Sequence, residues 1–252
     1  MGRPRALPVN IPRRVEPEWL DVLAPSDPRA ARSRRDLRRV NALMGNAAIV
    51  ARHVQKIFSV NAPRRIAEIG AGDGTFMLRL AQNMSAPPRD VTVVLLDRHD
   101  IVGRQELERF SALRWRVEPV AADVFEWLAR PAGEEFDAMI ANLFLHHFKP
   151  AELTALLSLV ARRTRVFIAC EPRRSGLALA GSHLLWAIAC NDVSRHDAAI
   201  SVRAGFDGEE LSALWPQAGG WRLREGAQGL FSHCFVASLA SASAVRHGSA
   251  AL

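Results

Sequence analysis

The chain has 252 residues, of which 49% are hydrophobic and 23% charged, an ordinary globular composition that excludes wholesale disorder. Its length fits one large α/β domain with an appendage. Its three cysteines, Cys170, Cys190 and Cys234, are odd in number and far apart, which argues against a disulfide framework or a zinc site and fits a reducing cytoplasm.

The basic residues concentrate at the start of the chain. Residues 1–65 contain 13 Arg and one Lys against five acidic residues, a net charge of +9, whereas the whole chain carries +7. Such a segment suits nucleic acid, an acidic carrier protein or a phosphorylated substrate. Alternatively, the basic charge indicates no partner and reflects only the use of Arg in place of Lys throughout the chain. The first residues lack the apolar segment of a signal peptide.

The first 60 residues predict a helical cap. Residues 1–28 are rich in proline, and Pro25 and Pro28 predict an irregular segment. Between Ser33 and Phe58, apolar residues recur at helical spacing, which predicts one or two helices with Gly45 as a break.

After residue 64, short apolar runs alternate with amphipathic stretches. This alternation predicts a parallel, doubly wound sheet. The predicted helices between its first strands include Phe76–Gln82, Arg104–Ala112 and Ala151–Val160. The seven predicted strands are Arg65–Ile69, Val91–Leu96, Arg114–Val120, Asp137–Leu143, Arg165–Cys170, Trp221–Glu225 and Phe231–Leu239.

The last two strands have only Gly226–Leu230 between them, which is too short for a parallel crossover and predicts an antiparallel hairpin. The predicted fold class is therefore α/β, with a Rossmann-like, mostly parallel, seven-stranded sheet and an N-terminal helical cap. The most apolar run, Leu177 to Cys190, is shorter than the roughly 20 residues that cross a bilayer. We expect a buried helix there and no membrane span.

The first predicted strand runs into the sequence Glu-Ile-Gly-Ala-Gly-Asp-Gly at residues 68–74. Glycines at a strand-to-helix turn permit positive φ and let the backbone approach a nucleotide-like ligand. The dinucleotide fingerprint requires a glycine where Thr75 stands. The pattern E-x-G-x-G-x-G instead resembles the first motif of the class I S-adenosylmethionine (SAM)-dependent methyltransferases, and three later segments, within residues 64–172, are similar to the same family.

In doubly wound sheets ligands lie at the carboxyl ends of the strands. The resemblance places a ribose-binding acid at Asp97 and an adenine-contacting acid at Asp123, with the backbone of Val124 beside the ring. Structurally, either acid can instead be a helix N-cap or a surface residue, and Asp123 suits the N-cap of a helix at Val124–Ala129.

The fourth strand ends in Asn-Leu-Phe-Leu-His-His-Phe at residues 142–148. This resembles small-molecule methyltransferases in which a strand ends near the reacting methyl group and a His-His-Phe sequence begins the next helix. The resemblance implies SAM as the cofactor. The residues that it implies for cofactor binding are Glu68, Gly70, Gly72, Gly74, Asp97, Asp123, Val124 and Asn142.

The resemblance also implies a domain organisation. We expect a basic segment and helical cap at residues 1–60, a SAM-binding methyltransferase domain at 61–240 and a flexible tail at 241–252. A substrate-pocket insertion is expected at 175–206. In this fold an N-terminal segment commonly closes over the cofactor, so Arg38, Asn41 and Asn46 are expected to meet the methionine carboxylate or the substrate, or else to form a solvated basic face.

Methylation of a hydroxyl benefits from a general base, and His has the suitable ordinary pKa. His146 and His147 are nearest to the reacting methyl by resemblance, although either can cap the helix or pack. His196 lies in a polar cluster after the apolar run. This position predicts either a base in a loop of the substrate pocket or a loop residue whose hydrogen bonds are made by its neighbours. Glu171, after the fifth strand, faces the pocket or caps the chain beside Pro172.

The absence of other motifs narrows the reaction. Residues 142–145 lack the proline motif of amino-methylating DNA enzymes, no cysteine follows a proline, and no carboxylate cluster predicts a metal. We therefore expect a metal-free, cytoplasmic enzyme, similar to those of bacterial secondary metabolism, that methylates a small, fairly apolar acceptor at a phenolic or enolic oxygen. The oligomeric state stays open, and a homodimer is allowed.

Two alternatives remain. The basic segment suits an RNA methyltransferase, although few aromatic residues accompany it as stacking platforms, so nucleic acid is disfavoured but not excluded. The second alternative is a non-catalytic binding module, because fold alone does not prove chemistry.

Overall fold

The computed structural model describes residues 11–24, 26–131, 135–183 and 190–239. The predictions for Pro25, for the end of the 177–190 run and for the tail at 241–252 lie wholly or partly outside these residues. Among the described helices, none has the length and apolar character needed to cross a membrane.

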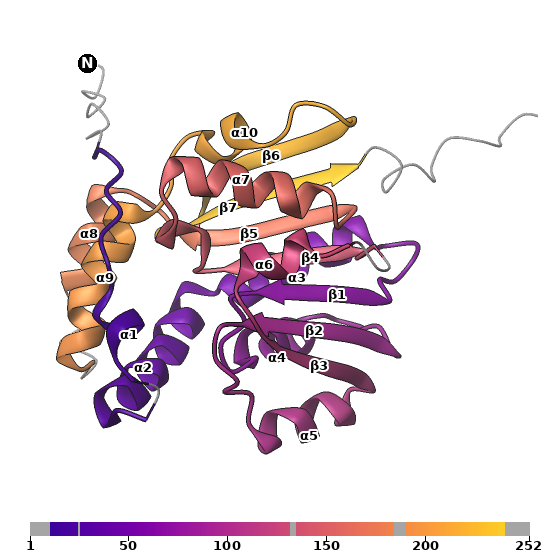
Figure 1. Cartoon of the computed structure of the whole chain (residues 1–252), viewed down its shortest axis with the longest axis horizontal. Coiled ribbons are helices and arrows are strands. Elements are labelled where there is room, and N and C mark those ends of the chain that lie inside the picture. The colour runs from indigo at the N-terminus through magenta and orange to yellow at the C-terminus, as the bar shows by residue number, and fades with distance from the viewer. Residues whose placement is uncertain (1–10, 25, 132–134, 184–189, 240–252) are drawn as a thin grey trace, which may run out of the picture.

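A seven-stranded sheet lies at the centre of the molecule, in the order β3-β2-β1-β4-β5-β7-β6 (Figure 1). The first five strands are parallel, and β7 runs antiparallel to both β5 and β6. The predicted fold class is thus confirmed, including the terminal hairpin. The strands are β1 (Arg65–Ile69), β2 (Val91–Asp97), β3 (Trp115–Ala121), β4 (Ala138–Asn142), β5 (Val166–Pro172), β6 (Trp221–Gln228) and β7 (Ser232–Leu239).

Helices cover both faces of this sheet. In β5, Val166 and Ile168 belong to the core on one face, whereas Phe167 and Ala169 belong to the core on the other. Successive side chains point to opposite faces of a strand, so a strand buried on both sides is apolar throughout. The helices that flank the sheet are α3 (Asn46–Ile57), α4 (Thr75–Gln82), α5 (Arg104–Ala112), α6 (Val124–Ala129), α7 (Pro150–Ala161) and α10 (Glu210–Leu214).

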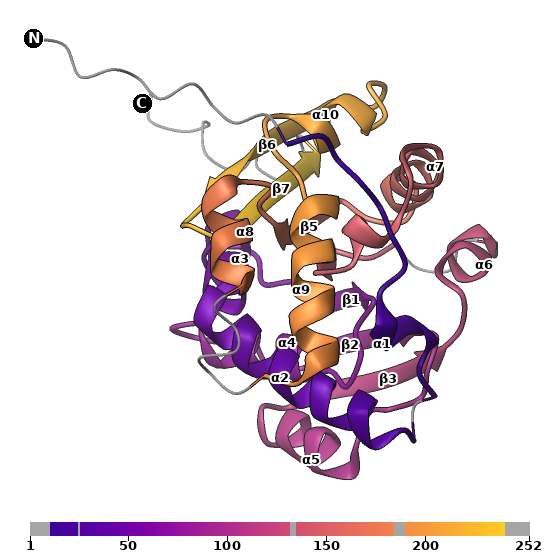
Figure 2. The same cartoon turned by 90° about the vertical axis from the view of Figure 1, so that its left-hand side faces the viewer.

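A helical cap lies beyond the carboxyl ends of the parallel strands (Figures 1 and 2). Hydrogen bonds join its longest helices: for example, Asp36 accepts the Asn191 N–H at 2.8 Å, and the Ser33 and Ser194 hydroxyls lie 2.9 Å apart. The cap contains α1 (Trp19–Val22), α2 (Pro28–Met44), α8 (Gly176–His183) and α9 (Asp192–Ala204), beside the short 3₁₀ helix η1 (Leu145–His147).

The cap confirms one expectation and corrects another. Gly45 separates α2 from α3 in the left-handed conformation, with φ 70°, as predicted for the break. Pro28, however, does not interrupt a helix but begins α2. The N–H of the first helical position has no acceptor within the helix, so proline, which lacks this group, is favourable there. Asp27 caps the turn by accepting the Arg29 N–H at 2.7 Å.

Three further local predictions were wrong. The His-His-Phe sequence does not begin a helix, because it forms η1, and α7 starts only at Pro150. The predicted loop around His196 is helical, since the Asn191 side chain caps α9 by accepting the Ser194 N–H. The helix predicted for the apolar run is not fully buried, because Leu177 in α8 is 56% exposed.

Candidate active site

The glycine turn between β1 and α4 is the first element of the site. Gly70, Gly72 and Gly74 all have positive φ, at 71°, 53° and 75°. A Cβ at Gly70 would lie 2.2 Å from the ring of Phe144, so packing alone requires glycine there. A Cβ at Gly72 would meet nothing within 4 Å, and its absence leaves open space in front of the turn.

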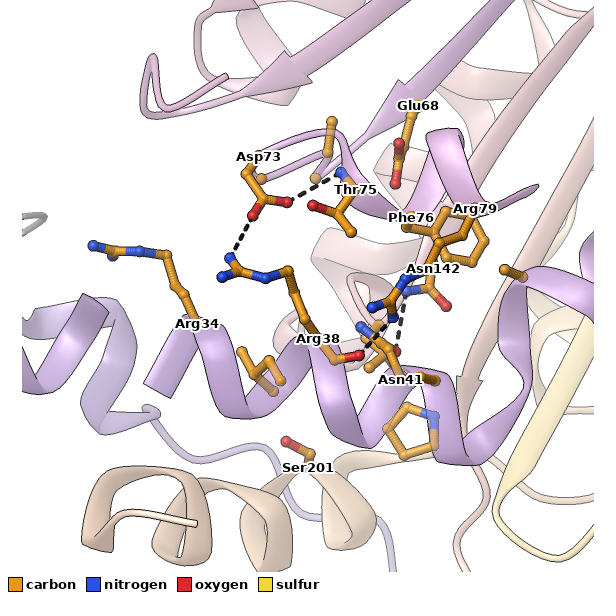
Figure 3. A pocket seen from close by; sticks show the side chains of 18 of the residues that line it. Arg34, Arg38, Asn41, Glu68, Asp73, Thr75, Phe76, Arg79, Asn142 and Ser201 are labelled. Carbon is orange, nitrogen blue, oxygen red and sulfur yellow. Dashed lines mark hydrogen bonds and ion pairs between the residues drawn. The ribbon is translucent and has the colours of Figure 1, made fainter. Parts of the chain in front are cut away.

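A cavity of about 390 Å³ lies between this turn, α2 and η1; we call it the polar cavity (Figure 3). Four of the residues that the sequence assigned to the cofactor line it: Glu68, Gly70, Gly72 and Asn142. The structure therefore brings together the ends of β1 and β4, which are neighbours in the sheet.

The other predicted cofactor residues lie outside this lining. Asp97 is the last residue of β2 and accepts the Gly72 N–H at 2.8 Å. Asp123 is the N-cap of α6, as predicted, and accepts the Phe125 N–H at 2.8 Å. Gly74 begins α4, and Val124 is buried. Whether the two acids also contact a nucleoside stays a prediction.

Glu68 is a buried acid in the wall of the polar cavity. Burial raises the pKa of its carboxyl group well above the ordinary value, and the charges of Asp73 and Asp97 raise it further. Its Oε2 atom has no hydrogen-bond partner among the described residues. A protonated carboxyl group in this position offers a hydrogen-bond donor to whatever occupies the cavity.

Arginines form the opposite wall. Arg38 projects from α2 toward the glycine turn, and its Nη1 atom lies 2.7 Å from Asp73 Oδ2 (Figure 3). Arg34, one turn earlier on α2, also lines the cavity. Arg79 on α4 donates to the Arg38 carbonyl at 2.6 Å. This cluster of guanidinium groups suits a carboxylate ligand.

Asparagines close the inner end of the polar cavity. Asn46 donates to the Asn142 side chain at 2.9 Å, and Asn142 donates in turn to Asn41 at 3.5 Å. The N-terminal helices and β4 are thereby joined at the point where the strand ends.

His146 is a buried imidazole between two acids. Its Nδ1 lies 2.8 Å from Glu171 Oε2 and its Nε2 lies 3.4 Å from Glu18 Oε1. Burial lowers the pKa of His146, but the two carboxylates outweigh that effect and raise it to about 9. His146 is therefore an imidazolium at neutral pH, with both nitrogens engaged.

Glu18 was missed by the sequence analysis. It is buried, and Ser201 on α9 donates a short hydrogen bond to its Oε1. Burial raises the pKa of Glu18, but the contacts with His146, His147 and Ser201 outweigh it and lower the pKa to about 2. No local pattern marks this residue, because its partners are all distant in the sequence.

A segment at residues 11–22, which we call the N-terminal strap, carries Glu18 into the site (Figure 2). Arg13 donates to the carbonyls of Ala204, at 2.8 Å, and Phe148, at 3.0 Å. Asp197 on α9 accepts the N–H groups of Trp19, at 2.9 Å, and Leu20, at 3.0 Å. These contacts fix the strap on both sides of Glu18.

The structure separates the three predicted base candidates. His147 lines the polar cavity beside His146, and its Nδ1 lies 3.3 Å from Asp21 Oδ2. His196 is outside that lining. Its ring stacks on Trp19 with centroids 3.8 Å apart, and its Nδ1 lies 2.9 Å from Asp197 Oδ1.

A second cavity, of about 320 Å³, lies between α2, α8 and α9; we call it the apolar cavity. Leu37, Val40 and Met44 of α2 face Ala198 and Val202 of α9 across it. The residues that line both cavities are Glu18, Leu20, Leu37, Leu143, Pro172 and Ser201. The cavities therefore meet where Glu18 and Ser201 provide the polar atoms.

The sequence predicted no cluster of metal-binding donors, but the structure brings together Glu18, His146 and His147. Their ligand atoms lie within 4.8 Å of one another. Glu18 already contacts His146 and Ser201, so most of these ligand atoms already have a partner within the protein. We therefore regard the cluster as an ion-pair network.

Several arginines of the basic N-terminal part bond within the chain. Arg13 contacts carbonyl groups, Arg29 pairs with Asp27, and Arg38 pairs with Asp73. These contacts give no support to the RNA methyltransferase alternative, which stays a prediction.

Comparisons with known proteins agree with this geometry. Residues 66–166 match a family model described as a methyltransferase domain. No curated protein sequence matches the chain significantly. Among solved structures, the plantazolicin methyltransferase BpumL in complex with SAH has a TM-score of 0.61 at 11% identity, covering 85% of this chain and 91% of its own.

Two other solved structures share the fold. An O-methyltransferase family protein from Burkholderia thailandensis has a TM-score of 0.56 at 14% identity, over 85% of this chain and 61% of its own. The pyocyanin biosynthetic protein PhzM has a TM-score of 0.56 at 19% identity, over 88% and 61%. The matched segment contains the glycine turn and the strand ends that form the polar cavity, so the chain carries a class I SAM-dependent methyltransferase domain.

Proposed function

We propose that the protein transfers a methyl group from SAM to a phenolic or enolic oxygen of a small, fairly apolar acceptor. The observation that carries the proposal is the junction of two cavities of different character. The polar cavity has the glycine turn and the arginines, whereas the apolar cavity has aliphatic walls. Ligand sites of this kind combine apolar walls with a few polar groups that fix orientation.

The residues of the polar cavity fit SAM. The open space in front of Gly72 leaves room for the ligand chain, and the unpartnered Oε2 of Glu68 needs a partner. Arg38 and Arg79 would hold the methionine carboxylate. Asp97 would meet the ribose hydroxyls, and Asp123 with Val124 would meet the adenine. Bound SAM supplies an electrophilic methyl group on a positively charged sulfur.

His147 is the histidine that we assign to proton removal. His146 is already protonated at neutral pH, and His196 lies outside both cavities. A ring nitrogen of His147 would take the proton from the acceptor hydroxyl as the new bond from oxygen to the methyl carbon forms and the bond from sulfur to that carbon breaks. Leu37, Leu143 and Pro172 give the junction apolar walls, and a bound acceptor between them would displace water and strengthen the electrostatic interactions there.

Calorimetric titration with S-adenosylhomocysteine (SAH), with NAD as the control ligand, tests the cofactor site. We expect micromolar affinity for SAH and a weaker affinity in Asp97→Ala. Glu108→Ala removes an exposed acid on α5 and should leave the affinity unchanged. Preferential binding of NAD would contradict the proposal.

The acceptor atom is tested by incubating the protein with isotopically labelled SAM and a panel of phenols, enols and amines. We expect methyl ethers as products, which methyl NMR shifts distinguish from N-methyl and C-methyl products. His147→Ala should lower kcat by about 10²- to 10⁴-fold, the usual contribution of a general base. Methylation confined to nitrogen or carbon would refute the assignment to oxygen.

A further inference from the structure

The charged residues are divided unequally between the two cavities. Arg34, Arg38 and Arg79 line the polar cavity. Among the described residues that line the apolar cavity, the charged side chains are two carboxylates, Glu18 and Asp197, and none is Lys or Arg. The polar end of the apolar cavity therefore presents negative charge to any molecule that fills the cavity.

The two carboxylates differ in what they can still bind. Asp197 accepts the Trp19 N–H at Oδ1 and the Leu20 N–H at Oδ2, so both of its oxygens hold the strap. The hydrogen bond from Ser201 and the contact with His146 both involve Glu18 Oε1. Glu18 itself lines both cavities, so its carboxylate stands where they meet.

The basic groups beside Glu18 are shared with other acids. His146 lies between Glu18 and Glu171, so one imidazolium is shared by two buried carboxylates. His147, the other imidazole beside Glu18, pairs with Asp21. An anionic group placed beside Glu18 would be desolvated next to a like charge, which is costly in a buried site. A hydroxyl or an ammonium group would instead donate a hydrogen bond to the carboxylate.

We propose that Glu18 selects the acceptor by charge, admitting apolar molecules with a neutral, proton-donating or cationic group and rejecting those with an anionic group. This inference rests on the proposed function, because it assigns the acceptor to the apolar cavity. It makes the N-terminal strap part of the specificity site, although Glu18 lies outside the segment that matches the methyltransferase family model.

Three probes that share the naphthalene ring test the proposal by calorimetry on the full chain saturated with SAH: 2-naphthol, (2-naphthyl)methylamine and 2-naphthoate. We expect the phenol and the amine to bind at least about tenfold more tightly than the carboxylate. Glu18→Gln should abolish most of this preference, whereas Glu18→Asp, which keeps the charge, should retain it. The thermal midpoint of each variant reports on folding.

Glu16→Gln is the matched control, since Glu16 lies on the same strap, pairs with Arg14 and does not line either cavity. Equal affinity for naphthoate and naphthol, no binding of any probe, or an unchanged preference in Glu18→Gln would overturn the inference. Failure of the proposed function is a separate result, namely no binding of SAH. The probe series is then repeated without SAH, because the apolar cavity belongs to the chain itself.

Discussion

His146 and Glu171 form a buried pair in which the imidazole Nδ1 lies 2.8 Å from the carboxylate Oε2. The other oxygen of Glu171 accepts the N–H groups of Phe144, at 3.1 Å, and Leu145, at 2.9 Å. A single acid at the end of β5 therefore fixes both the ring of His146 and the start of η1. Since η1 also carries His147, this pair positions the base that we propose.

The pair predicts a loss of stability at alkaline pH. The folded-state pKa of His146, about 9, exceeds its ordinary value of 6.5, so the native state binds this proton more tightly than the unfolded state. The stabilisation is complete below pH 6.5 and disappears as the pH rises through 9. We expect a contribution on the order of 1–3 kcal/mol to the free energy of unfolding.

Urea unfolding at pH 6, 8 and 9.5 measures this effect. Glu171→Gln removes the anionic partner and should flatten the dependence of stability on pH in this range. Glu108→Gln, on the exposed face of α5, should keep the dependence of the wild type. Parallel pH curves for wild type and Glu171→Gln would show that the proton on His146 is not held by this pair.

Gly72→Ala should weaken the binding of SAH without unfolding the protein. Its Cβ would project into open space of the polar cavity, where we place the cofactor, and the strain of φ 53° costs about 1 kcal/mol. Gly208→Ala is the matched control, because Gly208 has φ 61°, equally open surroundings and no place in the cavity lining. We expect at least tenfold weaker SAH binding only in Gly72→Ala; equal affinity in both variants would place the cofactor elsewhere.

His196→Ala should loosen the N-terminal strap rather than remove a base. The variant loses the stacking of His196 on Trp19 and the contact with Asp197. We expect faster cleavage by trypsin at Arg13 or Arg14 and a higher KM for the acceptor, with kcat changed less than in His147→Ala. A kcat loss as large as that of His147→Ala, with unchanged proteolysis, would instead support His196 as the base.

The sheet could be predicted from the sequence because its signals are local. The strand β5 is apolar from Val166 to Cys170, since both of its faces are buried, and the glycine turn indicates a backbone requirement at single positions. The N-cap at Asp123 was predicted for the same reason. Asn41, Asn46 and Asn142 were all assigned to the site, but the hydrogen bonds that join them could not be predicted from any local pattern.

The strap could not be predicted, because its stabilising contacts are distant in the sequence. Asp197 holds the backbone of Trp19 and Leu20, and Glu18 gains its role only where β4, β5 and α9 converge. Proline-rich composition correctly predicts the lack of long regular structure around Glu18 but carries no information on where the chain lies. His196 was assigned to the right helical cap but to the wrong secondary structure, for the same reason.

Asn46→Ala should lower both stability and affinity for SAH. The Asn46 side chain is fully buried, donates to Asn142 at 2.9 Å and accepts the Ser232 hydroxyl at 2.6 Å. Its removal leaves two buried polar partners unsatisfied, which costs about 2–4 kcal/mol, and it releases the Asn142 side chain at the wall of the polar cavity. Urea unfolding and SAH titration measure the two effects, with Asn61→Ala at an exposed position as the control. A variant that is destabilised yet binds SAH like the wild type would show that Asn142 does not contribute to the cofactor site.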